Sequence, residues 1–199
     1  MKYIKMLGLA AMAAMALMAF VGAGTASATT LEDSKGVHPT TISASLIGSA
    51  VLSNPAETST YDTCTEGTVH GEPSTCSATE TVKGAAAVSF VTSSCTSTTH
   101  ATEGGNLEIH HIAKTVNGTV TGNTFKVQVT IFGVPCTYGL SKTDTNVHVG
   151  TLTGSDTTPL MDINTIVPLR EGGFLCPGEA RWKATYEVTT PSSLTVTAG

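Results

Sequence analysis

The chain has 199 residues and a formal net charge of −5, and charged side chains occupy only 13% of its positions while hydrophobic ones occupy 40%. Threonine occurs 36 times and serine 17 times, but Lys and Arg form no cluster, which excludes a basic nucleic-acid binder. The ordinary apolar content and the modest net charge also argue against the highly charged type of disorder.

The N-terminal segment has the order of a secretory signal peptide. Lys2 and Lys5 precede an apolar run from Met6 to Val21, and small residues ending in Ala26-Ser27-Ala28 follow it. This run is shorter than the roughly 20 residues that a membrane-spanning helix needs. We therefore predict cleavage between Ala28 and Thr29, which leaves a signal peptide of residues 1–28 and a single secreted domain of residues 29–199 without membrane insertion.

Alternation of apolar and polar residues predicts strands throughout the rest of the chain, and no segment has convincing helical periodicity. It is clearest near Phe125 and near Trp182, whose parity places the indole in the core. The stretch from Asn54 to Ser77 is the least patterned, so we expect a long loop or an irregular hairpin there. In chain order, the predicted strands are residues 42–52, 82–90, 107–112, 125–131, 147–152, 161–167 and 182–188.

Turn signals separate these runs. Asn117-Gly118 and Gly122-Asn123 are typical hairpin residues, because they accept a positive φ at low steric cost. Such signals recur at roughly 8–12 residues, a spacing typical of a sandwich or a barrel. Alternation also indicates that one face of the sheet packs on a core and the other faces water, which is typical of antiparallel sheets. We predict an all-β fold, specifically an antiparallel β-sandwich of the immunoglobulin-like or jelly-roll-like type.

Five cysteines follow the signal peptide, so at most two intramolecular disulfides form and one thiol remains. No pair has the C-x-x-C spacing of a zinc or redox site. Cys136 and Cys176 both lie in short apolar stretches bounded by Gly, a context typical of segments that cross the ends of a sheet. We therefore favour the bridge Cys136–Cys176. Two pairings stay open for Cys64: Cys64–Cys95, or Cys64–Cys76 across a hairpin.

A set of sequence stretches spans most of the chain: MKYIKMLGLAA, GNLEIHHI, Cys136-Thr137-Tyr138-Gly139 with GTLTGS after it, and MDINTIVPLREGGFLCPGEARWKATYEVTTPSSLTV. Together they resemble uncharacterised secreted proteins of actinobacteria. The resemblance implies export, β structure and bridged cysteines, and no activity. Cys76 is absent from the pattern of these proteins, so the resemblance favours Cys64–Cys95 and leaves Cys76 as a free thiol. With one unpaired cysteine, the protein is expected to be a monomer or a covalent dimer through Cys76.

One group of residues has metal-ligating chemistry. Glu108 and His110 share a strand face, and His148 joins them if its strand is a neighbour, which would suit zinc or copper. Solvated strand residues are the simpler interpretation, so we expect no metal and no cofactor. The sequence also lacks a G-x-S-x-G nucleophile elbow and a phosphate-binding loop.

These observations predict a secreted, non-enzymatic protein, an envelope or extracellular binding or structural module with an unidentified extracellular partner. The alternative is a small secreted hydrolase with a dispersed site that uses His110 or His148 as its base. An inhibitor with a rigid loop, at residues 57–77 or 170–181, is a third class.

The signal-peptide prediction has a direct test. Because the cleavage motif ends at Ala28, the intact mass of the protein recovered from the culture medium should correspond to a chain that begins at Thr29. A protein of full-length mass in the membrane fraction would contradict it.

Overall fold

The computed structural model describes residues 29–198 except 74–79, 84–88, 91–93, 98, 104, 123, 142 and 145–146. The predicted signal peptide (residues 1–28) and Cys76 lie outside the described residues. The named elements are all strands, which confirms the all-β prediction: β1 (Thr29–Glu32), β2 (Ile42–Ser53), β3 (Thr60–Cys64), β4 (Gly67–Pro73), β5 (Glu80–Lys83), β6 (Ser89–Phe90), β7 (Thr99–Glu103), β8 (Asn106–His111), β9 (Gly118–Gly122), β10 (Lys126–Ile131), β11 (Val134–Gly139), β12 (Val147–Thr153), β13 (Leu160–Glu171), β14 (Glu179–Thr190) and β15 (Thr195–Ala198).

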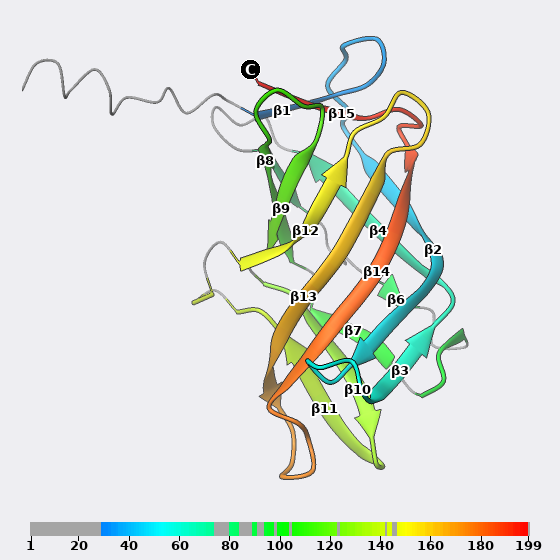
Figure 1. Ribbon diagram of the computed structural model, residues 1–199, viewed down its shortest axis with the longest axis vertical. Coiled ribbons are helices and arrows are strands. Elements are labelled where there is room, and N and C mark those ends of the chain that lie inside the picture. Colours follow the sequence, from blue (N-terminus) through cyan, green and yellow to red (C-terminus); the bar gives the residue numbers. More distant parts are fainter. Residues whose placement is uncertain are drawn as a thin grey trace, which may run out of the picture.

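Eight of these strands form a closed antiparallel ring. Their order is β12-β9-β8-β5-β4-β2-β14-β13, and β13 pairs again with β12 (Figure 1). The pairings join the ring strands into one continuous sheet and do not divide them into two stacked sheets. The antiparallel all-β part of the prediction is therefore confirmed, and the sandwich type is not.

The ring closes where β12 meets β13. Gly150 pairs with Ile163 in this register, and a Cβ atom at position 150 would collide with the backbone carbonyl oxygen of Asp162. A residue without a side chain therefore lets the two backbones approach closely enough to pair.

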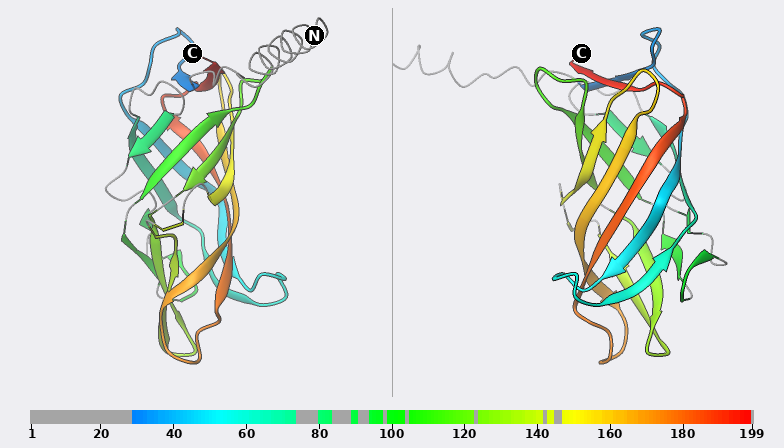
Figure 2. Two further views of the ribbon diagram at one scale, coloured as in Figure 1. Left: turned by 90° about the vertical axis from the view of Figure 1, so that its left-hand side faces the viewer. Right: turned by 45° about the vertical axis from the view of Figure 1, so that its right-hand side comes forward.

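Three strands of 12 residues each, β2, β13 and β14, extend beyond the ring. Past the ring, β13 pairs with β11, followed by β10 and β7, while β2 pairs with β3 on the other side. The result is an elongated molecule whose lower end is formed by the β10–β11 and β13–β14 turns (Figure 2). A two-stranded sheet of β1 and β15 lies across the opposite end, where Leu31, Leu194 and Val196 are at most 1% exposed.

The alternation read from the sequence matches the observed burial. On β10, Val127, Val129 and Ile131 are buried while the residues between them are half-buried. On β14, Trp182 is 5% exposed and its ring lies 5.3 Å from that of Phe125. The prediction that the indole belongs to the core is confirmed.

Some expectations about local structure were wrong. The stretch from Asn54 to Ser77 contains the regular strands β3 and β4, whose register is set by pairing with β2. Cys136 lies within β11 and not in chain crossing a sheet end. In the predicted strand 82–90, only β5 and β6 are described, and residues 84–88 lie outside the described part.

Both favoured disulfides are present, Cys136–Cys176 and Cys64–Cys95. Beside the second, the buried carboxylate of Asp62 accepts hydrogen bonds from the Ser97 amide at 2.8 Å and the Thr96 hydroxyl at 2.7 Å. The disulfide and these hydrogen bonds together hold the segment around Cys95 against β3.

Two completely buried tyrosines differ in whether their hydroxyl groups have a hydrogen-bond partner. The Tyr138 hydroxyl donates to the Pro177 carbonyl at 3.0 Å, whereas the Tyr186 hydroxyl has no hydrogen-bond partner among the described residues. Tyr138→Phe should therefore lower the free energy of unfolding by about 1–2 kcal/mol, while Tyr186→Phe should be neutral or slightly stabilising. Urea unfolding followed by Trp182 fluorescence measures both, and a larger loss for Tyr186→Phe would contradict the assignment.

Candidate functional site

The residues predicted as weak metal ligands lie on the outer wall of the ring. His110 Nε2 is 4.0 Å from Glu108 Oε2 on β8, so the prediction that they share a face is confirmed. His148 could join them only if its strand were a neighbour of β8, and this condition is not met: β9 lies between β8 and β12, and Thr121 pairs with Glu108 on one side and His148 on the other. The sheet therefore brings Glu108 and His110 together and keeps His148 one strand further away.

Within the described residues, potential ligand atoms lie within 4.8 Å of one another at Asp62, Cys64 and Cys95. Cys64 and Cys95 are the two halves of a disulfide, so neither offers a thiolate. This group fits a structural role.

A serine–histidine contact that the sequence analysis missed lies on the ring wall. Ser43 on β2 pairs with His70 on β4, and Ser43 Oγ lies 2.9 Å from His70 Nδ1. His70 is exposed, and the hydrogen bond lies across two strands on an open surface. Pairing between distant strands produces this contact, so no local sequence motif signals it.

A concavity lies on the outer face of the three long strands. It has a volume of about 440 Å³, within the usual range for ligand pockets. Its floor consists of β2, β14 and β13, and its rim is the loop between β2 and β3, which reaches across β14 in Figure 1. We call it the outer groove; its lining residues are Ser49, Val51, Ser53, Glu57, Thr60, Asp162, Ile163, Asn164, Lys183, Ala184 and Thr185.

The rim loop is held by its own hydrogen bonds. The Asn54 side-chain oxygen accepts from the amides of Thr58 at 2.8 Å and Ser59 at 3.0 Å. The Arg181 guanidinium on β14 then donates to the Pro55 carbonyl at 3.0 Å, which fixes the loop over the strands. The groove is therefore preformed.

Charges of both signs meet at the rim. Lys183 Nζ lies 2.9 Å from Glu57 Oε2, and Arg181 Nε lies 3.5 Å from Glu57 Oε1. The hydrogen bond from Lys183 lowers the pKa of the Glu57 carboxyl, with further help from the two positive charges. Glu57 is therefore a persistent anion and is unsuited to act as a base near neutral pH.

Hydroxyl and amide groups on the floor already have fixed partners. The Thr185 hydroxyl donates to Asp162 Oδ1 at 2.7 Å, and Arg181 donates to the side-chain oxygen of Asn164 at 2.7 Å. The Ser53 hydroxyl donates to the Asn54 carbonyl at 3.1 Å. The groove thus presents donors and acceptors that hydrogen bonds hold in place.

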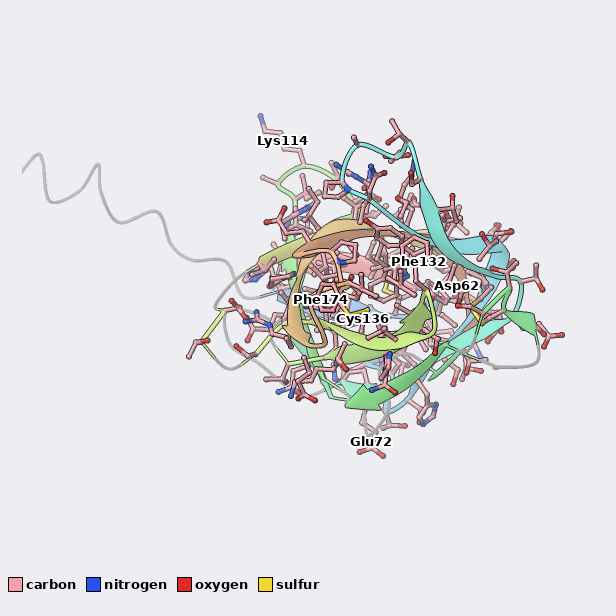
Figure 3. The ribbon with its side chains drawn as sticks, turned by 90° about the horizontal axis from the view of Figure 1, so that it is seen from below. Asp62, Glu72, Lys114, Phe132, Cys136 and Phe174 are labelled. Atoms are coloured by element: carbon pink, nitrogen blue, oxygen red, sulfur yellow. A yellow bond between two sulfur atoms is a disulfide. The ribbon has the colours of Figure 1, made fainter. Side chains whose placement is uncertain are left out.

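A second surface feature is the lower end of the molecule. Phe132 in the β10–β11 turn is 85% exposed, and Phe174 in the β13–β14 turn is 96% exposed. Seen from below in Figure 3, both lie at the end that faces the viewer, near Cys136. Cys136 and Cys176 link the strand of one turn to the loop of the other, with their Cα atoms 5.6 Å apart.

No protein-family model matches the chain, and neither a curated protein nor a solved structure matches it. Among the described residues, no helix is long and apolar enough to cross a membrane. The outer groove and the lower end are therefore interpreted from their own geometry.

The sequence analysis did not find the outer groove. Its lining residues come from two parts of the chain, residues 49–60 and 162–185, that are more than 100 residues apart in sequence, and no local motif marks them. Only the positions of Lys183 and Thr185 were visible, because their alternation with Trp182 and Ala184 places them on the wet face.

The Glu57–Lys183 contact gives a pH prediction. The carboxyl pKa is lower in the folded protein than in the unfolded chain, so the contribution of this pair to the closed rim is present above the unfolded pKa and is lost as pH falls through the folded one. We expect the carboxyl carbon of Glu57 to titrate below its normal range by NMR. Lys183→Met should return the midpoint toward normal, whereas Lys114→Met at the far end should not; an unchanged midpoint in Lys183→Met would contradict the contact.

Proposed function

We propose that the protein is a secreted, non-enzymatic extracellular binding module whose binding site is the outer groove. The observation that carries this proposal is the preformed concavity of about 440 Å³ with ordered polar groups and charges of both signs. Two disulfides are compatible with an oxidising extracellular compartment.

The chemistry of the lining favours a polar peptide segment of an extracellular component as the ligand. Asp162 and Lys183 offer an acceptor and a donor of opposite charge on neighbouring strands, and Asn164 offers an amide beside them. A peptide carries matching ammonium, carboxylate and amide groups. The lining contains no aromatic side chain on which a sugar ring would stack.

An array of short peptides of varied charge, followed by calorimetry on the strongest binder, tests this proposal. Lys183→Met should weaken that binder about tenfold, since a hydrogen bond to a charged group contributes about 1.5–3 kcal/mol. Lys114→Met is the matched control, because Lys114 is an exposed lysine in the β8–β9 turn, at the upper end in Figure 1 and outside the lining of the groove. Equal affinities for both variants, or no peptide binding, would overturn the groove as the site.

The hydrolase alternative has one observation in its favour, the hydrogen bond between Ser43 and His70. It predicts turnover of ester or amide substrates that is abolished by Ser43→Ala or His70→Ala, and the earlier candidates His110 and His148 are tested in the same way. The binding-module proposal expects no turnover in a broad hydrolase panel. Turnover lost in any of these variants would replace it.

A further inference from the structure

We propose that the lower end of the molecule is a contact site for a lipid surface, into which Phe132, Phe174 and Leu175 insert. This surface, which we call the apolar tip, consists of the β10–β11 and β13–β14 turns. The inference is independent of the outer groove, and neither proposal depends on the other.

The exposure of these side chains is the first observation. Phe132 is 85% exposed, Phe174 96% and Leu175 44%. Burying a side chain of this size is worth roughly 1.5–3 kcal/mol, so leaving three of them in water at one end is unfavourable unless something covers them. Val37 and Val116 are also exposed, but they are smaller, less exposed than either phenylalanine, and belong to the β1–β2 and β8–β9 connections at the opposite end.

The absence of charge along both turns is the second observation. The segments Ile131–Thr137, IFGVPCT, and Gly172–Gly178, GGFLCPG, contain no Asp, Glu, Lys or Arg. Charged groups begin only behind the tip, at Glu171 and Glu179, and Lys126 lies 3.9 Å from Glu171. The tip can therefore enter an apolar layer without carrying a charge with it.

The shape of the tip separates a lipid surface from a protein pocket. The two turns are the lowest points of the molecule in Figures 1 and 2, and Figure 3, which views the molecule from below, shows Phe132 and Phe174 at this end. A ring that is almost fully exposed touches solvent on most sides, and a fluid interface covers such a ring more completely than a rigid partner does. Interfacial apolar side chains reach about 5–10 Å into this layer.

The tip is also rigid enough to insert without reordering. The β10–β11 turn has positive φ at Phe132 and Gly133, which is the geometry of a tight two-residue hairpin. In the other turn the Cys176 amide donates to the Gly173 carbonyl at 3.0 Å, and the Leu169 amide donates to the Gly178 carbonyl at 2.8 Å. These bonds satisfy backbone groups that an apolar layer would otherwise leave without partners.

Vesicle flotation tests the proposal, with purified protein whose N-terminus is established by intact mass. The wild type should float with neutral phosphatidylcholine vesicles, equally well at low and high salt and with or without added phosphatidylglycerol, because the tip is uncharged. The double variant Phe132→Ser/Phe174→Ser should lower the partition coefficient at least tenfold. The matched control, Val37→Ser/Val116→Ser, should leave it unchanged.

Three results would overturn the proposal. The first is flotation that persists in the tip variant. The second is flotation that requires the anionic lipid and disappears in high salt, because it indicates headgroup electrostatics. The third is no flotation, together with a wild type that sediments as a dimer and a tip variant that sediments as a monomer, because it assigns the tip to contact between two copies of the chain. Peptide binding in the outer groove is measured separately and is unaffected by all three.

Discussion

Pairing between β12 and β13 is the constraint on which the rest of the structure depends. It requires that position 150 have no side chain, because the carbonyl oxygen of Asp162 occupies the place of a Cβ atom. Once this pairing forms, each of the eight ring strands has a neighbour on both sides, and on β8, β9 and β14 alternate side chains point into the interior. Closure thus determines at once which residues form the core and which face outward.

Because side chains fill the interior of the ring, any ligand or partner must bind to the outer surface of the protein. Tyr186, Val120 and Val149 are at most 1% exposed inside the ring, and β1 and β15 cover its upper end. The three long strands continue past the ring and carry the surfaces that remain. The outer groove lies on their wet face, and the apolar tip lies at the end where β13 turns into β14.

Local signals predicted β2, β8, β10, β12, β13 and β14, because alternation is a property of short segments. For the disulfides, cysteine context favoured Cys136–Cys176, whereas only the resemblance favoured Cys95 over Cys76 as the partner of Cys64. Alternation gave the buried side of β2, β10 and β14 residue by residue. It could not predict closure or the neighbours of each strand: whether His148 lies beside Glu108 depends on β9 being placed between β8 and β12. The strands β3 and β4 were missed for a related reason, since their sequences are weakly apolar and pairing with β2 supplies what propensity does not.

At the apolar tip, too, one feature follows from the local sequence and another depends on a long-range contact. On β10 the inward positions are odd-numbered, so the parity of the strand alone places Phe132 outward, next to Ile131, which is 4% exposed. The turn at residues 172–178 has no strand parity to follow. There Cys176 is 9% exposed and is bridged to Cys136, so the disulfide takes the inward position and leaves Phe174 and Leu175 on the outside. Strand parity therefore accounts for one exposed ring, and a long-range covalent bond accounts for the other.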